Sequence, residues 1–407
     1  MSGIVLSASV RQNLLSLQST ADLLSTTQNR LATGNKVNSA LDNPTNFFTA
    51  QGLNNRASDI TNLLDSIGNG VQVLQAANTG ITSLQKLVDT AKSLANQVLQ
   101  APTGYSTKAN VDVVGTGAGT GTVTAANINT GKLAGAVLTF KTSTGTLAVT
   151  LGATFATGSG TATVNSLDQL NSVLASNNVA VTASVSATAD TLTFTSTNDA
   201  ASQTITKSGT APTGQGVDIT AATATVGTVN AAVADAASQA IRANLVSQYN
   251  NVIAQITTTA QDSSFNGINL LNGDNLKLTF NETGKSTLNI QGVTFNAAGL
   301  GLASLTSGTD FLDNDSANKA LTLLGSASTS LRTEASALGS NLSIVQIRQD
   351  FSKSLINVLQ TGSSNLTLAD TNEEAANSQA LSTRQSIAVS ALALANQSQQ
   401  SVLQLLR

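Results

Sequence analysis

The two ends of the chain carry one repeating pattern, and a helix with this pattern needs a partner. Apolar and small residues recur there in alternating steps of three and four, which places them on one stripe of an α-helix, as along the seam of a coiled coil. Both stripes are narrow, so neither helix buries enough surface to be stable alone. The sequence therefore predicts that the two ends pair and gain order on assembly. The stripes consist of Val10, Leu14, Leu17, Ala21, Leu24, Gln28 and Leu31 at one end and of Leu381, Ala388, Ala391, Ala395, Ser398, Val402 and Leu405 at the other.

The composition excludes several classes of site. Only 10% of the 407 residues are charged and the net charge is −3, whereas about a quarter of the residues of an ordinary globular protein are charged. We therefore expect no nucleic-acid partner. The chain has no Cys and no His, so it has no thiol nucleophile, no imidazole base and no H-E-x-x-H zinc site. We expect no cofactor and no enzymatic activity.

Two longer helical patterns lie inside the terminal ones. The first runs from about residue 46 to 100, roughly 80 Å at 1.5 Å per residue, and the second covers 316–360. The first helix of the chain is expected over 5–33 and the last over 371–405, and a shorter helical pattern begins at about 236. We expect the packing of a helical shaft to depend on Ile67, Val71, Leu74, Leu84, Val88, Leu331, Leu338, Leu342 and Val345.

The middle of the chain has a different pattern. Between residues 103 and 235 Thr, Ser, Gly and Ala dominate and apolar residues alternate, which predicts antiparallel strands. A short helix is expected over 166–176, and a β-hairpin over 275–295, with Gly284 in its turn. The predicted fold is a mainly α coiled-coil shaft of antiparallel long helices from both chain ends, with a β-hairpin and an inserted β-rich outer domain. The predicted domains are 1–43 with 366–407, 44–102 with 236–365, and 103–235.

The N-terminal residues do not resemble a Sec-type signal peptide, since they lack a basic region followed by a long apolar run. No stretch approaches 18 apolar residues, so no membrane span is expected.

Three segments carry a resemblance to a known family. Residues 29–44 (NRLATGNKVNSALDNP), 264–271 (SFNGINLL) and 394–407 (LANQSQQSVLQLLR) resemble the N-terminal signature, the segment before the β-hairpin, and the ending of bacterial flagellins. The resemblance covers roughly residues 1–102 and 237–407.

The resemblance implies a structural subunit of the flagellar filament, located outside the cell. Family members are exported unfolded through the flagellar export apparatus with a chaperone, and they polymerise with copies of themselves beneath a filament cap, next to hook-junction proteins. The inner helices would then assemble through the stripe residues named above.

One segment of the first long helix departs from the family. Residues 87–97 (LVDTAKSLANQ) align with the stretch that Toll-like receptor 5 recognises in many flagellins. Leu87, Lys92, Leu94 and Gln97 keep that pattern, whereas Thr90 and Ser93 stand where Arg and Glu are usual. Loss of a guanidinium and a carboxylate weakens polar recognition, so we expect weak or no activation of the receptor.

Three alternatives remain open. A hook–filament junction protein or another flagellar axial protein would share the end helices. A coiled-coil adhesin would need a membrane anchor or a signal peptide. An enzyme in the 103–235 region is the remotest, and the GKST run at residues 284–287 lacks the earlier Gly of a phosphate-binding loop.

Overall fold

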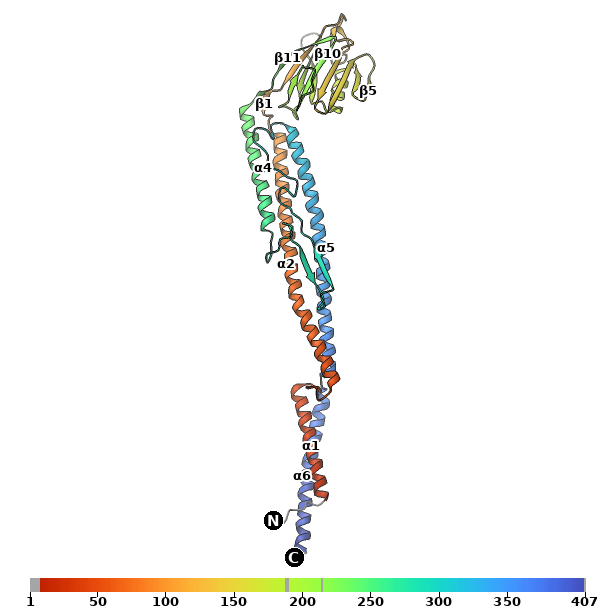
Figure 1. Cartoon of the computed structure of the whole chain (residues 1–407), viewed down its shortest axis with the longest axis vertical. Coiled ribbons are helices and arrows are strands. Elements are labelled where there is room, and N and C mark those ends of the chain that lie inside the picture. Colours follow the sequence, from red (N-terminus) through yellow and green to blue (C-terminus); the bar gives the residue numbers. More distant parts are fainter. Residues whose placement is uncertain (1–7, 187–189, 214, 406–407) are drawn as a thin grey trace. The chain divides into compact units, whose positions relative to one another are not determined.

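The computed structural model describes residues 8–186, 190–213 and 215–405 (Figure 1). Six α-helices and fourteen strands lie in this part of the chain, and long helices from both ends of the chain flank a β-rich insertion, as predicted. The predicted start of the first helix at residues 5–7 lies outside the described residues. The helices are α1 Ala8–Thr33, α2 Pro44–Gln100, α3 Leu167–Ser176, α4 Ala236–Asp262, α5 Asn314–Thr367 and α6 Thr371–Leu405, with a 3₁₀ turn η1 at Gly131–Leu133.

The chain forms two compact units, and each is described by itself. The terminal unit comprises the described residues within 1–72, 277–290 and 341–407, and the module unit comprises those within 73–276 and 291–340. Helices α2 and α5 contribute to both units. The three-part division expected from the sequence stays a prediction.

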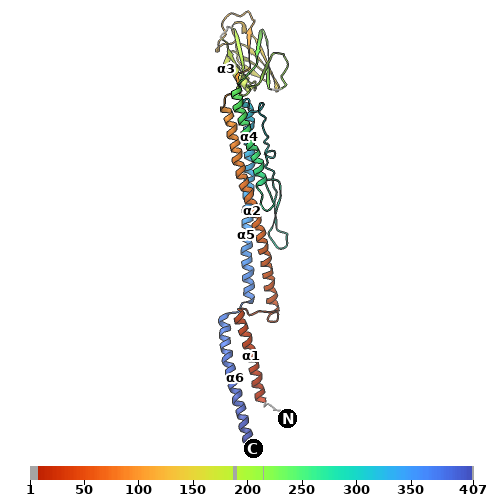
Figure 2. The same ribbon diagram turned by 90° about the vertical axis from the view of Figure 1, so that its left-hand side faces the viewer.

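The terminal unit holds α1 beside α6, the first part of α2, the last part of α5, and a β-hairpin (Figure 2). The hairpin strands are β13 Leu276–Thr279 and β14 Thr287–Ile290. Ala57 and Ile60 on α2 form a small buried cluster with Leu359 on α5. Gly70 lies so close to the hairpin that a Cβ there would meet the Leu278 side chain at 2.3 Å. In the GKST run, Gly284, Lys285 and Ser286 lie in the turn of this hairpin and Thr287 begins β14.

In the module unit α4 and the first part of α5 run beside the last part of α2 (Figures 1 and 2). The inward faces of these helices are apolar with helical spacing. Their fully buried side chains include Leu74, Ile81, Leu84 and Val88 on α2, Val246, Ile253 and Ile256 on α4, and Leu324 and Leu331 on α5.

The β-rich module of the same unit consists of two main sheets with α3 and a small neck sheet. The strand order is β5-β6-β4-β3-β10-β9 in one sheet and β11-β2-β8-β7 in the other, and β1 pairs with β12 at the neck. The strands are β1 Tyr105–Thr107, β2 Asn110–Gly115, β3 Val137–Thr142, β4 Gly145–Leu151, β5 Ala156–Gly158, β6 Thr161–Val164, β7 Val181–Val185, β8 Thr191–Ser196, β9 Thr204–Thr206, β10 Gly216–Ala222, β11 Ala224–Asn230 and β12 Val233–Ala234.

The module core is apolar and draws on both main sheets and α3. Phe140 on β3 and Phe194 on β8 are fully buried, and their rings meet edge to face with centroids 5.3 Å apart. Most strand pairs are antiparallel as predicted, but β4 pairs with β6, and β9 with β10, in parallel. Alternation of apolar residues shows which face of a strand is buried but not the direction of its neighbour, so the sequence pattern could not reveal these two pairs.

Candidate assembly surface

The α1–α6 pair meets along a seam that contains several polar residues. On α1, Val10, Thr20 and Thr27 are buried, and Leu17 and Leu24 are half-buried. The Thr20 hydroxyl donates to the Ser16 carbonyl one turn earlier, 2.8 Å away, so this buried polar atom is satisfied within its own helix. The facing side of α6 has buried Glu374 and half-buried Leu381, Ala388, Leu392 and Ala395.

The stripe residues predicted from the sequence divide between this seam and the outer surface. Leu14 and Leu31 lie on the exposed side of α1, and Ala391 lies on the exposed side of α6, where Leu392 takes the seam position. Val402 and Leu405 belong to α6, but their side chains lie outside the described part of the structure.

One ion pair and three main-chain hydrogen bonds tie the start of the chain to its last third. Arg30 Nη1 lies 3.2 Å from Glu374 Oε1. The Lys36 and Val37 main-chain N–H groups both donate to the Thr367 carbonyl, 2.7 and 3.3 Å away, and the N–H of Ala369 donates to the Gly34 carbonyl at 2.9 Å.

The loop between α1 and α2 explains the residue types of the 29–44 segment. Asp42 Oδ2 accepts the Ser39 and Asn38 main-chain N–H groups at 2.8 and 3.0 Å. Hydrogen bonds to the charged form lower the pKa of the Asp42 carboxyl, first from Ser39 and then from Asn38. Asn43 Oδ1 accepts the Asn46 N–H at 3.0 Å, as an N-cap does.

Large apolar side chains remain exposed over the terminal unit. Leu15 is 67% exposed and Leu394 is 69% exposed, although both lie on helices that already have a partner. Such side chains are more numerous on this unit than on the module unit, and exposed apolar surface is a mark of protein interaction sites. The set comprises Leu14, Leu15, Leu23 and Leu31 on α1, Leu41 in the loop, Phe48 on α2, Ile344, Ile347, Phe351 and Val358 on α5, Leu368 in the loop that follows, and Ile387, Val389 and Leu394 on α6.

The predicted shaft residues lie mostly inside. Val71 and Leu342 are half-buried. The other predicted shaft residues are buried, namely Ile67, Leu74, Leu84, Val88, Leu331, Leu338 and Val345.

The 264–271 segment follows α4 and starts the loop that leads to the hairpin. Asn266 and Gly267 have φ of 50° and 81°, a left-handed pair that suits a tight turn. The buried Asn269 amide donates to the Ala260 and Gln261 carbonyls, each 2.8 Å away. Its Oδ1 accepts the Leu271 N–H at 2.9 Å. Asn269 thus satisfies carbonyls at the end of α4 that have no helical partner.

Arg242 is a buried residue that no sequence pattern singles out. Its guanidinium donates to the Ala101 and Pro102 carbonyls just after α2 and to the Phe311 carbonyl just before α5. A cation suits a helix C-terminus, so Arg242 joins the end of α2 to α4. Burial lowers its pKa, which nearby Asp313 partly offsets.

Asp313 precedes α5 and is itself buried. Burial raises the pKa of its carboxyl, against the hydrogen bonds from Ser202 and from the Ser316 main chain. The Ser316 N–H belongs to the first turn of α5, so Asp313 caps this helix.

Residues 87–97, which align with the stretch that Toll-like receptor 5 recognises, are partly inaccessible. Leu94 is buried and Leu87 is half-buried within the module unit. Gln97 is exposed, and Lys92 Nζ lies 4.0 Å from Asp89 Oδ1 one turn earlier.

The described residues contain neither a membrane-spanning helix nor a cluster of metal-ligating side chains. None of the helices in that part of the chain is apolar over a length that would span a bilayer. Within the same ranges no three acidic side chains come together as metal ligands would.

Comparison with known proteins agrees with this geometry. Residues 5–111 match the bacterial flagellin N-terminal helical region, and residues 321–406 match the bacterial flagellin C-terminal helical region. Flagellin FljM of Caulobacter vibrioides is 34% identical over 168 residues, which are 40% of this chain and 59% of that relative. Flagellin A of Rhizobium meliloti is 38% identical over 81 residues, 20% of this chain and 21% of the relative.

The chain therefore spans about three fifths of the length of the Caulobacter relative that it matches. The two family models cover the helical regions at both ends of the chain, where the paired helices and the signature loop lie. The helical regions at both ends of the chain, residues 5–111 and 321–406, therefore belong to the bacterial flagellin family.

Proposed function

We propose that this chain is the structural subunit of a bacterial flagellar filament, a helical polymer of identical copies located outside the cell and used for motility. The observation that carries the proposal is the exposed apolar surface of the α1–α6 pair. Helices with a narrow, partly polar seam gain little from pairing with each other. Burial of exposed leucines against neighbouring copies supplies the missing free energy, at about 1.5–3 kcal/mol for each large apolar side chain.

The proposal includes the other partners expected of the family. The subunit would leave the cell unfolded through the flagellar export apparatus with a chaperone, and it would add beneath the filament cap, beyond the hook-junction proteins. Its role is non-catalytic, since the chain has neither the thiol nor the imidazole on which most acid–base and nucleophilic sites depend.

Substitution on the exposed face of α1 tests polymerisation. The double variant Leu15→Ser/Leu23→Ser removes two exposed side chains without touching the α6 seam. We expect the monomer to unfold as the parent does, while the critical concentration for filament growth rises more than about 100-fold. Electron microscopy and sedimentation measure this.

The matched control is Phe155→Ser, which replaces an exposed apolar side chain of the β-rich module. It should polymerise at the parental concentration. Parental assembly by the α1 double variant contradicts the proposal, and oligomers of a few copies in place of long filaments favour a junction protein.

Proteolysis tests the coupling of folding to assembly. Filaments heated to monomers should be trimmed within residues 1–43 and 366–407 and then fail to reassemble, because the terminal helices are marginal without neighbours. Protease-resistant ends in the free monomer contradict this.

Weak activation of Toll-like receptor 5 is part of the proposal. Thr90 and Ser93 are exposed, so arginine and glutamate at these positions would be accessible to a receptor. In a reporter-cell assay the parent should activate poorly and the Thr90→Arg/Ser93→Glu variant more strongly. Full activation by the parent contradicts the expectation.

A further inference from the structure

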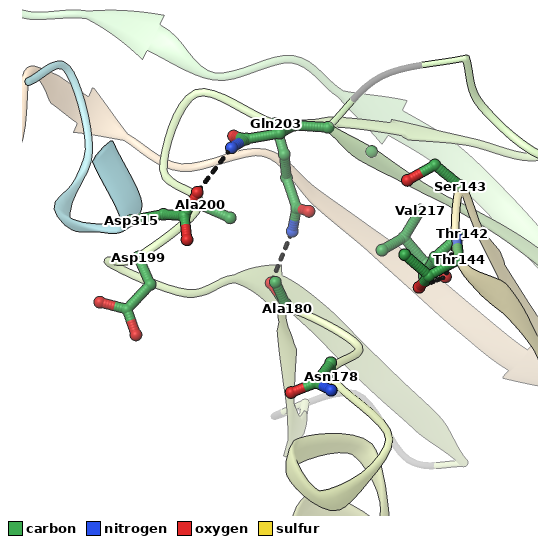
Figure 3. A pocket seen from close by; sticks show the side chains of 12 residues that line it. Thr142, Ser143, Thr144, Asn178, Ala180, Asp199, Ala200, Gln203, Val217 and Asp315 are labelled. Carbon is green, nitrogen blue, oxygen red and sulfur yellow. Dashed lines mark hydrogen bonds between the residues drawn. The ribbon is translucent and has the colours of Figure 1, made fainter. Parts of the chain in front are cut away.

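A cavity of about 270 Å³ lies in the module unit, where the β-rich module meets the start of α5 (Figure 3). Five segments far apart in the sequence line it: the β3–β4 turn, the residues after α3, the loop before β9, the start of β10, and the first turn of α5. Its size is close to the lower end of ordinary ligand sites, which begin at about 300 Å³. The filament role proposed above does not use this cavity.

The wall of the cavity carries one amide whose orientation is fixed. Gln203 is 3% exposed, its Nε2 donates to the Ala180 carbonyl at 2.5 Å, and its main-chain N–H donates to the Ala200 carbonyl at 3.0 Å. Because the amide nitrogen is engaged, the oxygen is left as the acceptor, and it points toward the side of the cavity that holds Ser143 and Thr144 (Figure 3).

The remaining polar side chains around the cavity are three hydroxyls and two amides, which both donate and accept hydrogen bonds, and two carboxylates, which only accept. Asp199 forms no ion pair with any described residue. Asp315 lies 2.6 Å from Lys319 Nζ and also accepts the Gln215 amide at 3.0 Å. Ala180, Ala200 and Val217 supply apolar surface between these groups.

This chemistry excludes most ligand classes. The described lining residues include two carboxylates and no Lys or Arg, so an anion is repelled. A quaternary or primary ammonium is poorly served, because Lys319 already neutralises Asp315, the Asp199 carboxylate is exposed to solvent that screens its charge, and the described lining offers no aromatic ring. A neutral ring with several hydroxyl groups, which donate and accept, and with apolar C–H faces matches both the polar groups and the apolar patch.

We propose that this cavity binds one sugar unit. The Gln203 oxygen accepts one of its hydroxyl protons, and Val217 contacts a C–H face of the ring. The exposed Asp199 carboxylate, which points away from Gln203 (Figure 3), rotates inward to accept a second hydroxyl proton. The sugar can be a free monosaccharide or the last residue of a glycan, since both present the same ring.

The test uses the unassembled full-length chain, labelled for NMR and titrated with the methyl glycosides of galactose, mannose and N-acetylglucosamine. We expect one of them to produce saturable shifts at Gln203 and Thr144, with a dissociation constant of about 1 mM, typical of so small a ligand. Asp199→Ala should weaken binding about tenfold, and Thr144→Trp, which fills the cavity from an exposed turn, should abolish it.

The matched control is Asp168→Ala, which removes an exposed carboxylate of α3 outside the cavity and should bind as the parent does. Shifts that persist in Thr144→Trp, the absence of saturation with all three glycosides, or saturation by methylammonium alone would each overturn the proposal. Beads that carry the bound sugar as a terminal residue distinguish the two sources: retention of the protein on them identifies a glycan end, and binding of the free glycoside alone identifies a small molecule.

Discussion

Arg30 on α1 and Glu374 on α6 form an ion pair that joins residues from opposite ends of the chain, with Nη1 and Oε1 3.2 Å apart. The two side chains differ in exposure, because Arg30 is 37% exposed and Glu374 only 11%. The pair lies at the end of α1 and the start of α6, next to the hydrogen bonds of Lys36 and Ala369. It therefore holds the two helices together at the end where α1 stops and α6 begins.

Removal of Arg30 should weaken assembly. In Arg30→Ala the mostly buried Glu374 carboxylate loses its cation, and after allowance for solvent screening we expect a cost of about 1 kcal/mol. The critical concentration for filament growth should rise about fivefold. The double variant Arg30→Ala/Glu374→Gln should lose less free energy of assembly than the two single variants lose together. Strict additivity of the two losses would show that the pair has no coupling energy.

Asn269 should be among the most sensitive polar residues of the module unit. Asn269→Ala leaves the Ala260 and Gln261 carbonyls and the Leu271 N–H without their partner in a buried site. We expect a loss of about 2–3 kcal/mol in the free energy of unfolding of the monomer, measured with denaturant. The control Asn96→Ala changes an exposed residue of α2 and should be neutral. Equal stability of the two variants would contradict the capping role.

Asp313 should stabilise the folded state more at low pH than at neutral pH, the reverse of the usual effect of a carboxylate. Burial raises the pKa of its carboxyl above the ordinary 3.8, so the folded state binds a proton at higher pH than the unfolded state does. The stability linked to this proton is fully present below about pH 3.8 and is lost as the pH rises through the folded pKa.

Measurement of unfolding against pH for the parent and for Asp313→Asn isolates this contribution, since other groups titrate alike in both. The parent should gain stability relative to the variant as the pH falls from neutral toward about 3.8. A gap that stays constant or moves the other way would exclude a raised pKa.

The β-rich module should be dispensable for polymerisation. Tyr105 and Ala234 are paired at the neck, so a short Gly-Ser link can replace residues 106–233 without a long gap. The deletion removes few of the exposed large apolar residues, because most lie in the terminal unit.

We expect filaments at nearly the parental critical concentration, with some loss of monomer stability. The loss arises because the Asn198 and Asp199 carbonyls, which accept the Asn314 and Asp315 N–H groups at the start of α5, are deleted. Addition of Leu15→Ser/Leu23→Ser to the deletion should abolish assembly. Failure of the deletion alone would place essential contacts in the module.

The sequence by itself determined the existence, type and order of the main elements. Three-four spacing predicted the long helices, and period-two alternation predicted the strands of the module, because both patterns follow from local backbone geometry. The 29–44 and 264–271 segments also follow from local chemistry, since Asp42, Asn43 and Asn269 satisfy main-chain groups close to them in sequence.

Only the tertiary structure decided which side of each terminal helix forms the seam. The stripes of small residues are so narrow that a rotation by one position is compatible with the pattern, and the structure buries Thr20 and Thr27 while Leu14 and Leu31 face outward. The burial of Arg242 was likewise invisible in the sequence, because its carbonyl partners lie about 70 to 140 residues away. Partners brought together over such distances depend on how the helices end and meet, and helical periodicity carries no information about that.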